Sequence, residues 1–246
     1  MSFSRILVAG AGGPLGLEIV RRLRARGARV IATYRTGRPG LAAAIEAFGA
    51  EPLQLDFEDG PALARTLAAV DGAVLTPILS VSKRAAPFLR MGVRAIFFSS
   101  NNVAIDPEDR VYAALNRAED EILNAATGAV ILRPCMIYGY PGDGNMSRLM
   151  NAMRRSPIIP LPGGGKALQQ PVYYEDLAEI AVRTLLDEAQ DERLYAVAGP
   201  QPITQRALYR SVAEAIGAKP AVIPAPVNLL APVINALQKA GIAAPV

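Results

Sequence analysis

Three glycines near the N-terminus have the spacing of a phosphate-binding turn. Gly10, Gly13 and Gly16 follow a short apolar run and open a segment with helical periodicity. The first glycine permits a tight turn, the second lets the backbone approach a pyrophosphate, and the third lets a helix pack closely against a strand. That helix begins at Pro14 and Leu15, where free N–H groups would meet the phosphates. These residues predict a dinucleotide site.

The end of the second apolar run indicates which dinucleotide binds. About 20 residues after the glycines, an acidic side chain normally binds the ribose hydroxyls of NAD. This chain has Tyr34 and Arg35 there instead. A guanidinium would pair with a 2′-phosphate through charge-assisted hydrogen bonds. We therefore predict NADP, with NAD as the alternative. In a second interpretation, Arg35 and Arg38 only solvate a loop.

The residue types that are missing narrow the chemistry. The 246 residues include no histidine and one cysteine, Cys135. An internal disulfide is therefore impossible, a structural metal is not expected, and nucleophile systems that need histidine are excluded. Tyr, Ser, Asp, Glu, Lys and Cys135 remain as acid–base or nucleophilic groups. For Cys135 we favour a small buried side chain over a catalytic thiol.

Composition and charge indicate an ordinary globular protein. The chain is 51% hydrophobic and 20% charged, with a net charge of +4. The arginines lie along helices, as in 21–26, without interleaved aromatic residues, so we expect a solvated helix face and no nucleic-acid site. The N-terminus has no targeting pattern, and no apolar run reaches the roughly 20 residues that cross a bilayer. We expect a cytoplasmic protein without a membrane span.

Short apolar runs alternate with helix-length segments in the first half of the chain. This alternation predicts an α/β fold, a Rossmann doubly wound parallel sheet with helices on both faces. The expected strands are 6–9, 29–33, 52–55, 72–76, 94–99 and 129–133.

From about Pro134 the regularity fades into turns rich in proline and glycine, which we interpret as a small C-terminal substrate lobe. We expect one domain over 1–246, with a nucleotide-binding core in 1–134 and a mainly substrate-side lobe in 135–246. Residues 227–240 look like a helix with one apolar side, for which docking against its own lobe is favoured over a membrane or partner role.

A second glycine cluster, Gly163 to Gly165 followed by Lys166, invites comparison with a phosphate-binding P-loop. The motif needs an earlier glycine at a fixed spacing and a serine or threonine after the lysine, whereas Ala167 follows here. No strand–loop–helix frame is expected around it. We therefore assign no phosphate site to this cluster.

Several segments, in the expected order, resemble signatures of the extended or atypical short-chain dehydrogenase/reductases. Together with the glycine turn they span most of the chain, and they are Phe97-Phe98-Ser99-Ser100, Ile131-Leu132-Arg133-Pro134, Ile137-Tyr138-Gly139 and residues 170–178. The Tyr34-Arg35 strand end and Gln170-Pro171-Val172 look most like the subgroup that contains the NADPH-binding accessory subunit of respiratory complex I. NmrA-like proteins are similar.

This resemblance implies further cofactor contacts at the ends of later strands. The family commonly has an aspartate after the third strand that touches the adenine, and Asp56 stands there. As an alternative, Asp56 could cap the helix that begins near Gly60. The expected contacts at these strand ends are Asp56, Phe57, Thr76, Pro77 and Pro134.

The resemblance also implies a catalytic Ser, Tyr and Lys. Ser100 matches the serine and Tyr112 is the candidate tyrosine, but Asn116 stands four residues later in place of lysine. If the helix is aligned on Arg117 instead, Ala113 takes the tyrosine position. Either way the Tyr–Lys pair is broken, although a phenol with a pKa of about 10 needs a nearby cation to react near neutral pH. The candidate catalytic residues are Ser100, Tyr112 and Asn116, with an ordinary half-buried helix tyrosine as the alternative for Tyr112.

Two functions follow from these expectations. The first is an NADP(H)-binding oxidoreductase or epimerase/dehydratase-like enzyme that acts on a small carbonyl or sugar-like substrate, and we favour it because the fold and the cofactor site point to it. The second is a non-catalytic NADPH-binding sensor or structural subunit, because the catalytic pair is broken beside an intact glycine turn. The substrate stays open, as do a homo-oligomer and an accessory role in a larger complex.

Overall fold

The computed structural model describes residues 5–35, 39–187 and 192–226. The chain forms two compact units. Unit 1 consists of Met1–Cys135 and Tyr174–Val197, and unit 2 of Met136–Tyr173 and Ala198–Val246. The segment Tyr174–Val197, which we expected within the C-terminal lobe, therefore belongs to unit 1. The helix expected over 227–240 lies outside the described residues.

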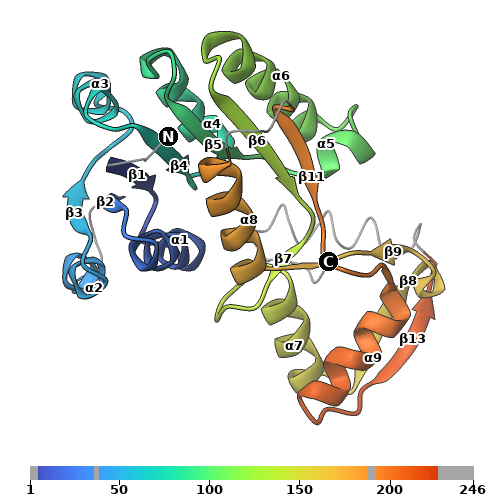
Figure 1. Ribbon diagram of the computed structural model, residues 1–246. Helices are drawn as coiled ribbons and strands as arrows, with labels where there is room; N and C mark the ends of the chain where they lie inside the picture. The colour runs from blue at the N-terminus through green and yellow to red at the C-terminus, as the bar shows by residue number, and fades with distance from the viewer. Residues whose placement is uncertain (1–4, 36–38, 188–191, 227–246) are drawn as a thin grey trace. The chain divides into compact units, whose positions relative to one another are not determined.

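Unit 1 is built on a parallel sheet of seven strands in the order β11-β6-β5-β4-β1-β2-β3 (Figure 1). The strands are β1 (Arg5–Ala9), β2 (Arg29–Tyr34), β3 (Glu51–Gln54), β4 (Gly72–Leu75), β5 (Arg94–Phe98), β6 (Ala129–Pro134) and β11 (Leu194–Val197). The chain runs outward from β1 in both directions, so the sheet is doubly wound. The predicted Rossmann fold is confirmed.

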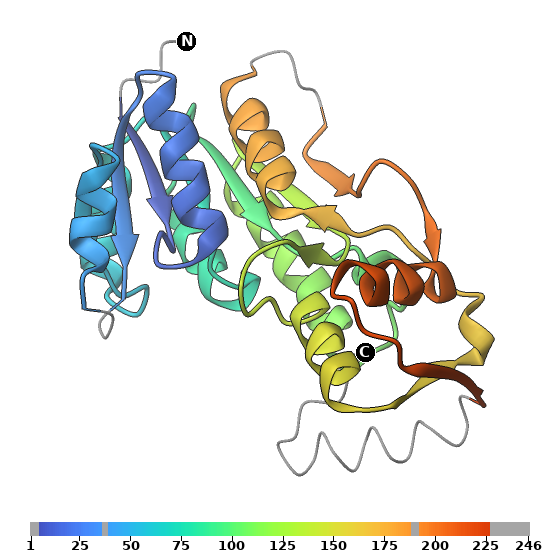
Figure 2. The ribbon, with the colours of Figure 1, turned by 90° about the horizontal axis from the view of Figure 1, so that it is seen from below.

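Helices cover both faces of this sheet. On one face, α1 (Pro14–Ala25) contacts β1 and β2, α8 (Tyr174–Leu186) contacts β4 and β5, and the two helices pack together (Figure 2). The other face carries α3 (Gly60–Ala68), α4 (Leu79–Ser82), the 3-10 helix η1 (Lys83–Phe88) and α6 (Arg110–Ala125). Two shorter helices, α2 (Leu41–Ala47) and α5 (Asn102–Ile105), lie beside β3 and α6.

Strand side chains alternate between the two faces, and both faces are buried. Leu7, Ile31 and Phe97 share a core with Leu63 of α3 and Ile122 of α6. A sheet buried on both sides needs apolar residues at almost every strand position, because successive side chains point to opposite faces. This explains why the strands are continuous apolar runs in the sequence.

An ion-pair network joins α1 to α8. Arg22 bonds Glu179 at 2.7 Å and Glu18 at 2.6 Å, and Arg26 bonds Glu179 at 2.7 Å. The Glu18 side chain is 10% exposed and that of Glu179 is 20% exposed. Hydrogen bonds from Arg183, Arg22 and Arg26 outweigh desolvation and lower the pKa of Glu179 to about 2. The network therefore holds ionised carboxylates between the two helices at neutral pH.

Unit 2 is smaller and, in its described residues, consists of short strand pairs and two α-helices. Its strands are β7 (Ile137–Tyr138), β8 (Ile158–Pro162), β9 (Leu168–Gln169), β10 (Val172–Tyr173), β12 (Ile203–Thr204) and β13 (Ala221–Ala225). They pair as β7 with β10, β9 with β12, and β8 with β13. The helices α7 (Met146–Arg155) and α9 (Gln205–Ala215) enclose a small core that includes Met146, Met153 and Tyr209.

The glycine cluster of unit 2 forms the 3-10 turn η2 (Gly163–Gly165), with φ of +55°, +70° and +72° at its three residues. Strand β9 follows Lys166, and no helix begins there. The frame of a P-loop is thus absent, as expected. Within the part of the chain that the structure describes, no helix has the length and apolar character needed to cross a membrane.

Candidate functional site

The strand order of unit 1 fixes where a ligand can bind. In an open α/β sheet, ligands bind beyond the carboxyl ends of the strands at the point where the winding direction reverses. Here that point lies between β1 and β4, whose last residues are Ala9 and Leu75. Gly10 follows the first strand and Thr76 follows the second. The structure thus brings these two predicted site residues together.

Close packing requires glycine at two of the three positions in the turn. Gly10 has a φ of +78°, and a Cβ atom there would lie 2.4 Å from Thr76 Oγ1. A Cβ atom on Gly16 would lie 2.5 Å from the Gly10 carbonyl oxygen. At Gly13, by contrast, a Cβ atom would meet only that oxygen, at 3.7 Å. The first and third glycines therefore close the turn, and the second leaves space at its surface.

Thr76 has a bracing role that the sequence did not indicate. Its hydroxyl donates to the Ala9 carbonyl oxygen at 2.8 Å, and its backbone N–H donates to the same oxygen at 3.1 Å. The hydroxyl also lies 3.3 Å from the Gly10 carbonyl oxygen. Thr76 therefore ties the end of β4 to the start of the glycine turn. A direct cofactor contact by Thr76 or Pro77 stays a prediction.

The N-terminus of α1 is open to an anion. Gly13 is the N-cap and supplies no side-chain hydrogen bond, Pro14 occupies the first turn, and no acidic residue stands there. The first N–H groups of a helix have no partner within the helix, and the helix dipole places partial positive charge on them. Such an end suits phosphate oxygens. The glycine turn and this helix end fit the pyrophosphate of a dinucleotide.

The neighbouring strand ends offer groups for the rest of a nucleotide. Tyr34 is half-buried at the end of β2, and Arg35 is exposed just after it. Asp56 is exposed, and its carboxylate accepts the Glu58 backbone N–H at 3.0 Å. Because Asp59 caps α3 through the Ala62 N–H at 2.9 Å, the interpretation of Asp56 as the helix cap is wrong.

Phe57 and Pro134 are buried, so their side chains form part of the packing around the site. Phe57 is 7% exposed and belongs to the core below the α3 face. Pro134 ends β6, and its carbonyl oxygen accepts the Asn101 N–H at 3.0 Å. Their contacts with a nucleotide stay predictions. Arg38, the second arginine considered at the ribose, lies outside the described residues.

Ser100 and Tyr112 are brought together by a residue that the sequence did not single out. Asn102, at the start of α5, donates its side-chain amide to the Tyr112 hydroxyl oxygen at 2.7 Å. Its backbone N–H donates to Ser100 Oγ at 3.3 Å. Both hydroxyl oxygens therefore accept a bond from Asn102, and both hydroxyl protons stay available for another acceptor. In the sequence, the only sign that Asn102 could bridge these two residues is its position two residues after Ser100.

The expected catalytic lysine is replaced by Asn116, and the cation nearest to it in the following bonds is Arg133. Arg133, on β6, donates from Nη2 to Asn116 Oδ1 at 3.4 Å and from Nε to Glu119 Oε1 at 3.0 Å. Glu119 is 1% exposed, and the Arg133 side chain is 15% exposed. A cation thus lies beside Asn116, but a buried carboxylate neutralises it. Arg117, the other lysine substitute considered, is exposed on α6.

No protein-family model matches the chain. Several curated proteins, two reductases among them, are similar to it in sequence. Carbonyl reductase [NADPH] 2 of Sus scrofa is 31% identical over 62% of this chain and 63% of its own length. The (4-alkanoyl-5-oxo-2,5-dihydrofuran-3-yl)methyl phosphate reductase of Streptomyces griseus is 27% identical over 86% of this chain and 74% of its own length.

A third relative is the NADH dehydrogenase [ubiquinone] 1 alpha subcomplex subunit 9, mitochondrial, of Arabidopsis thaliana. It is 30% identical over 47% of this chain, and the match spans only 29% of the relative's own length. Solved structures share the fold. The WbmH enzyme of Bordetella bronchiseptica in complex with NAD+ has a TM-score of 0.70 at 17% identity, over 90% of this chain and 85% of that one.

The crystal structure of gox2253 has a TM-score of 0.73 at 20% identity, over 97% of this chain and 84% of that one. The fold of the chain is that of these solved structures, and its sequence is similar to two reductases and to the complex I subunit. These likenesses are consistent with the extended short-chain dehydrogenase/reductases expected from the glycine turn and the later motifs.

Two further groups, Ser99 and Cys135, lie at the carboxyl ends of β5 and β6. The Ser99 hydroxyl is buried and has no hydrogen-bond partner among the described residues. Burial raises the pKa of the half-buried Cys135 thiol. A raised pKa reduces the thiolate fraction at neutral pH, so the thiol is poorly suited to act as a nucleophile.

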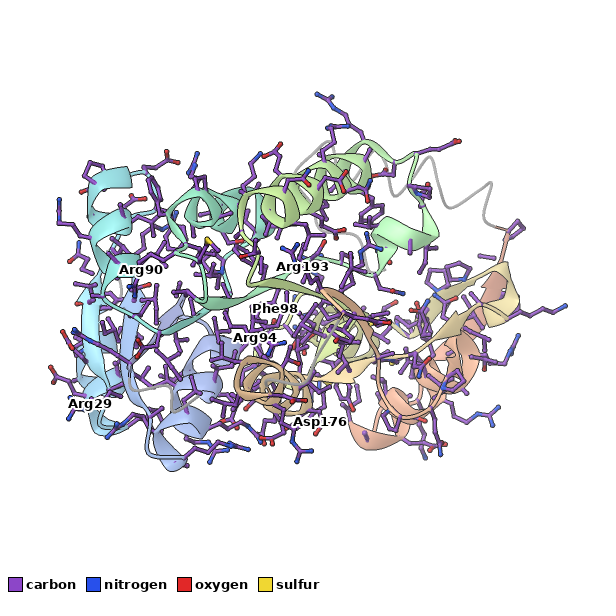
Figure 3. All side chains as sticks on the ribbon, turned by 45° about the horizontal axis from the view of Figure 1, so that its top comes forward. Arg29, Arg90, Arg94, Phe98, Asp176 and Arg193 are labelled. Carbon is purple, nitrogen blue, oxygen red and sulfur yellow. The ribbon has the colours of Figure 1, made fainter. Side chains whose placement is uncertain are left out.

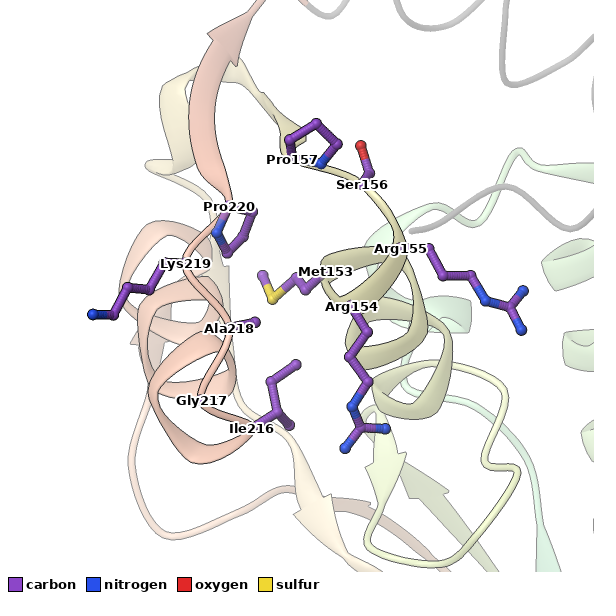
Figure 4. A pocket seen from close by; sticks show the side chains of 10 residues that line it. All are labelled: Met153, Arg154, Arg155, Ser156, Pro157, Ile216, Gly217, Ala218, Lys219 and Pro220. Atoms are coloured by element: carbon purple, nitrogen blue, oxygen red, sulfur yellow. The ribbon is translucent and has the colours of Figure 1, made fainter.

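A hollow of about 400 Å³ in unit 2 has basic side chains but does not form an anion site. Arg154, Arg155 and Lys219 line it together with Met153 and Ile216. Figure 4 shows the three basic side chains extending in different directions. The hollow also lies where α7 and α9 end, and helix C-termini carry partial negative charge. The basic side chains offset that charge.

Proposed function

We propose that this chain is a short-chain dehydrogenase/reductase that acts as an NADPH-dependent reductase of a small carbonyl compound. The observation that carries the proposal is the hydrogen-bonded chain of Ser100, Asn102 and Tyr112 beyond β5, in the same unit as the glycine turn. It presents two hydroxyl donors where this fold binds ligands. The two reductases among the relatives support the same reaction type.

The cofactor would be held mainly by backbone groups. The N–H groups at the start of α1 would bind the pyrophosphate, and the open surface at Gly13 would admit it. Arg35 would pair with a 2′-phosphate and favour NADPH over NADH. Asp56 would accept hydrogen bonds from the adenine. When bound, the cofactor supplies a hydride to the substrate carbon.

The chain itself supplies the proton. Tyr112 would donate its hydroxyl proton to the substrate oxygen, while Ser100 would hold that oxygen with a second hydrogen bond. The Asn102 amide, 2.7 Å from the phenol oxygen, stabilises the negative charge that develops there as the proton leaves. The carbonyl gains a hydride at carbon and a proton at oxygen, which gives an alcohol. A neutral amide stabilises a phenolate less than a lysine would.

A second candidate is a protein that binds NADPH without turnover, as a sensor or an accessory subunit. The observation in its favour is the charge balance around Asn116, where Glu119 neutralises the cation that approaches the helix. The likeness to the Arabidopsis complex I subunit is consistent with an accessory role. Retention of NADPH without consumption distinguishes this candidate from the reductase.

The test begins with titrations of the protein with NADPH and NADH, followed by a panel of aldehydes and ketones with nicotinamide absorbance as the readout. We expect oxidation of NADPH that falls at least about 100-fold in Tyr112→Phe, with NADPH affinity unchanged. The matched control is Tyr195→Phe, which removes a half-buried hydroxyl on β11 in the same unit. Tight binding without oxidation by any carbonyl would reject the reductase in favour of the second candidate.

A further inference from the structure

The two-stranded ribbon of β8 and β13 in unit 2 has no polar face. The opposite faces of the ribbon alternate along each strand, and Ile159 and Leu161, which are 4% and 0% exposed, point into the core of the unit. A ribbon with one face in a core normally presents polar side chains on the other. Here the pairing register places six apolar residues on the other face, which we call the outer face: Ile158, Pro160, Pro162, Ala221, Ile223 and Ala225.

The outer face is open to solvent. Ile158 is 53% exposed and Ile223 is 48% exposed, and Pro160 and Ala221 between them are exposed as well. Exposed apolar side chains that lie together mark surfaces that bind another molecule. The ribbon edges are poorly suited to pairing with a partner strand, because six prolines remove N–H donors from the two segments: Pro157, Pro160, Pro162, Pro220, Pro224 and Pro226. A partner would therefore contact the outer face itself.

Unit 2 is also strongly basic. Its described residues include seven cationic side chains and two carboxylates, while the whole chain has a net charge of +4, so the positive excess lies in this unit. One of the carboxylates, Asp143, is 3% exposed and accepts the N–H groups of Asn145 and Ser147. Among these residues, Glu214 is the only exposed carboxylate. The surface of unit 2 therefore attracts anions.

Cations stand at both ends of the outer face. Arg154, Arg155 and Lys219 line the hollow just before β8 and β13 begin, and Lys166 follows the far end of β8 after η2. All four are exposed, and none has a hydrogen bond or an ion pair with a described residue. Figure 4 shows that the side chains at the hollow spread instead of converging on one point, which suits a broad surface better than a small ion.

We propose that the outer face and its cations bind unit 2 to the surface of an anionic lipid bilayer. Such a surface offers acyl chains to apolar residues and negative headgroups to the cations beside them. This mode of binding needs no membrane-spanning helix, and it is independent of the reductase function.

Charge complementarity disfavours the other occupants. A second copy of the chain would bring the same cations against this face. Residues 227–246, which follow β13 in the sequence, contain one charged residue, Lys239, and therefore no carboxylate for the cations. An acidic polypeptide would pair with the cations but leave the apolar side chains in water. An anionic bilayer satisfies both parts of the surface.

A single tryptophan reports on the outer face, because the chain contains none. Full-length Ile223→Trp is mixed with vesicles of equal parts phosphatidylglycerol and phosphatidylcholine, or of phosphatidylcholine alone. We expect a blue shift of the emission, and quenching by brominated acyl chains, with the anionic vesicles only, and both effects should weaken at high salt. The matched control is Met91→Trp, at a side chain that is 90% exposed in unit 1, whose emission should not shift.

Charge variants test the cations by co-sedimentation with the same vesicles. Arg155→Gln with Lys219→Gln should weaken binding about 25-fold, because each cation near an anionic surface contributes about 5-fold. The matched control is Arg29→Gln with Arg65→Gln, which removes two exposed cations of unit 1 and lowers the net charge equally. Equal losses in the two double variants would reject the cations of unit 2 as the contact.

The apolar part is tested by Ile158→Ser with Ile223→Ser, which should weaken vesicle binding at least about 10-fold. Both positions are about half exposed, so the core stays intact, and Met91→Ser is the control. Unchanged binding in the double variant would reduce the contact to adsorption by charge and overturn the proposal.

Three results with Ile223→Trp would also overturn the proposal. An unshifted emission with anionic vesicles would show that no bilayer contact forms. An equal shift with polyglutamate would assign the surface to an acidic polypeptide. An emission that is already blue-shifted without vesicles would show that another part of this chain, or a second copy, covers the outer face. Dilution separates these last two cases, because only a second copy dissociates.

Discussion

The start of α1, at the carboxyl edge of the sheet in unit 1, and the helix ends at the amino edge differ in whether side chains bind their backbone polar groups. At the carboxyl edge, the N-terminus of α1 has neither a side-chain cap nor an acidic residue. At the amino edge, arginines donate to carbonyl oxygens near the ends of helices. Arg193 binds the Ala126 and Ala129 oxygens, Arg90 binds that of Val70, Arg94 binds that of Asp187 and Arg24 binds that of Ala28. Three of these arginines are labelled in Figure 3.

The difference follows from the direction of the helices. In a parallel α/β sheet, helix N-termini gather at the carboxyl edge with partial positive charge, and helix C-termini gather at the amino edge with partial negative charge. Arginines at the amino edge donate hydrogen bonds to carbonyl oxygens that have no partner within their helix. Their positive charge offsets the partial negative charge of the helix C-termini. At the carboxyl edge, Asp59 and Asp109 cap α3 and α6, whereas the start of α1 has no side-chain cap. The candidate binding site is therefore the helix N-terminus whose N–H groups no side chain satisfies.

The largest expected effect concerns the ion pair between the half-buried Arg133 and the buried Glu119 near the carboxyl edge. Glu119→Ala would leave the Arg133 guanidinium without its carboxylate, which should lower the free energy of unfolding by about 3 kcal/mol. Urea denaturation measures this loss. The double variant Glu119→Leu with Arg133→Met should recover most of the stability, because no charge is then buried. A loss below about 0.5 kcal/mol in the single variant would contradict the ion pair's role.

The glycine turn should be the next most sensitive feature. Gly16→Ala places a Cβ atom 2.5 Å from the Gly10 carbonyl oxygen, so α1 or the turn must move. We expect NADPH affinity to fall about 100-fold, measured by titration. Gly144→Ala is the control, since nothing lies within 4 Å of a Cβ atom there. Unchanged affinity in Gly16→Ala would show that the turn does not form the phosphate site.

The amino edge should respond in stability alone. Arg193→Leu removes the bonds to the Ala126 and Ala129 oxygens, with Nε to Ala129 at 3.0 Å, and should lower the free energy of unfolding by about 2 kcal/mol. NADPH affinity should stay within about 2-fold of the parent, because the change lies at the opposite edge from the glycine turn. A loss of NADPH affinity as large as that of Gly16→Ala would contradict the view that the amino edge contributes to stability and not to NADPH binding.

Both ends of β2 carry an exposed arginine, which gives a matched pair. Arg35→Gln at the carboxyl end should reduce the preference for NADPH over NADH about 10-fold. Arg29→Gln at the amino end of the same strand should leave that preference unchanged. Dissociation constants for the two nucleotides in each variant decide the matter. Equal effects from both variants would reject Arg35 as the 2′-phosphate partner.

The smallest effect concerns pH and the network between α1 and α8. The folded-state pKa of Glu179 is about 2, below the ordinary value of 4.5. Its contribution to stability is therefore full above pH 4.5 and is lost as the pH falls toward 2. Glu179→Gln should remove this part of the acid sensitivity, by about 1 kcal/mol or less because the network is near solvent. Unfolding curves at pH 7 and pH 3 measure the change.

Much of the fold could be predicted because its signals are local. Each strand of the first six lies within two residues of its apolar run, since burial on both faces demands continuous apolar sequence. The glycine turn could also be predicted from the sequence. Gly10 has a positive φ, and Gly16 lies in close contact with the turn itself, so both positions require glycine. The return of α8 and β11 to unit 1 was not predicted. Their neighbours are far away in sequence, and β11 pairs with β6.

The sequence by itself determined the Rossmann sheet, the glycine turn, the absence of histidine chemistry and the broken Tyr–Lys pair. Only the tertiary structure decided which groups surround that pair. Asn102 reaches the Tyr112 hydroxyl across a loop, and Arg133 reaches Asn116 and Glu119 from another strand. Such contacts depend on how separate segments pack. The identity of two side chains does not by itself determine the distance between their donor and acceptor atoms. The position of each donor relative to its acceptor is therefore a property of the fold.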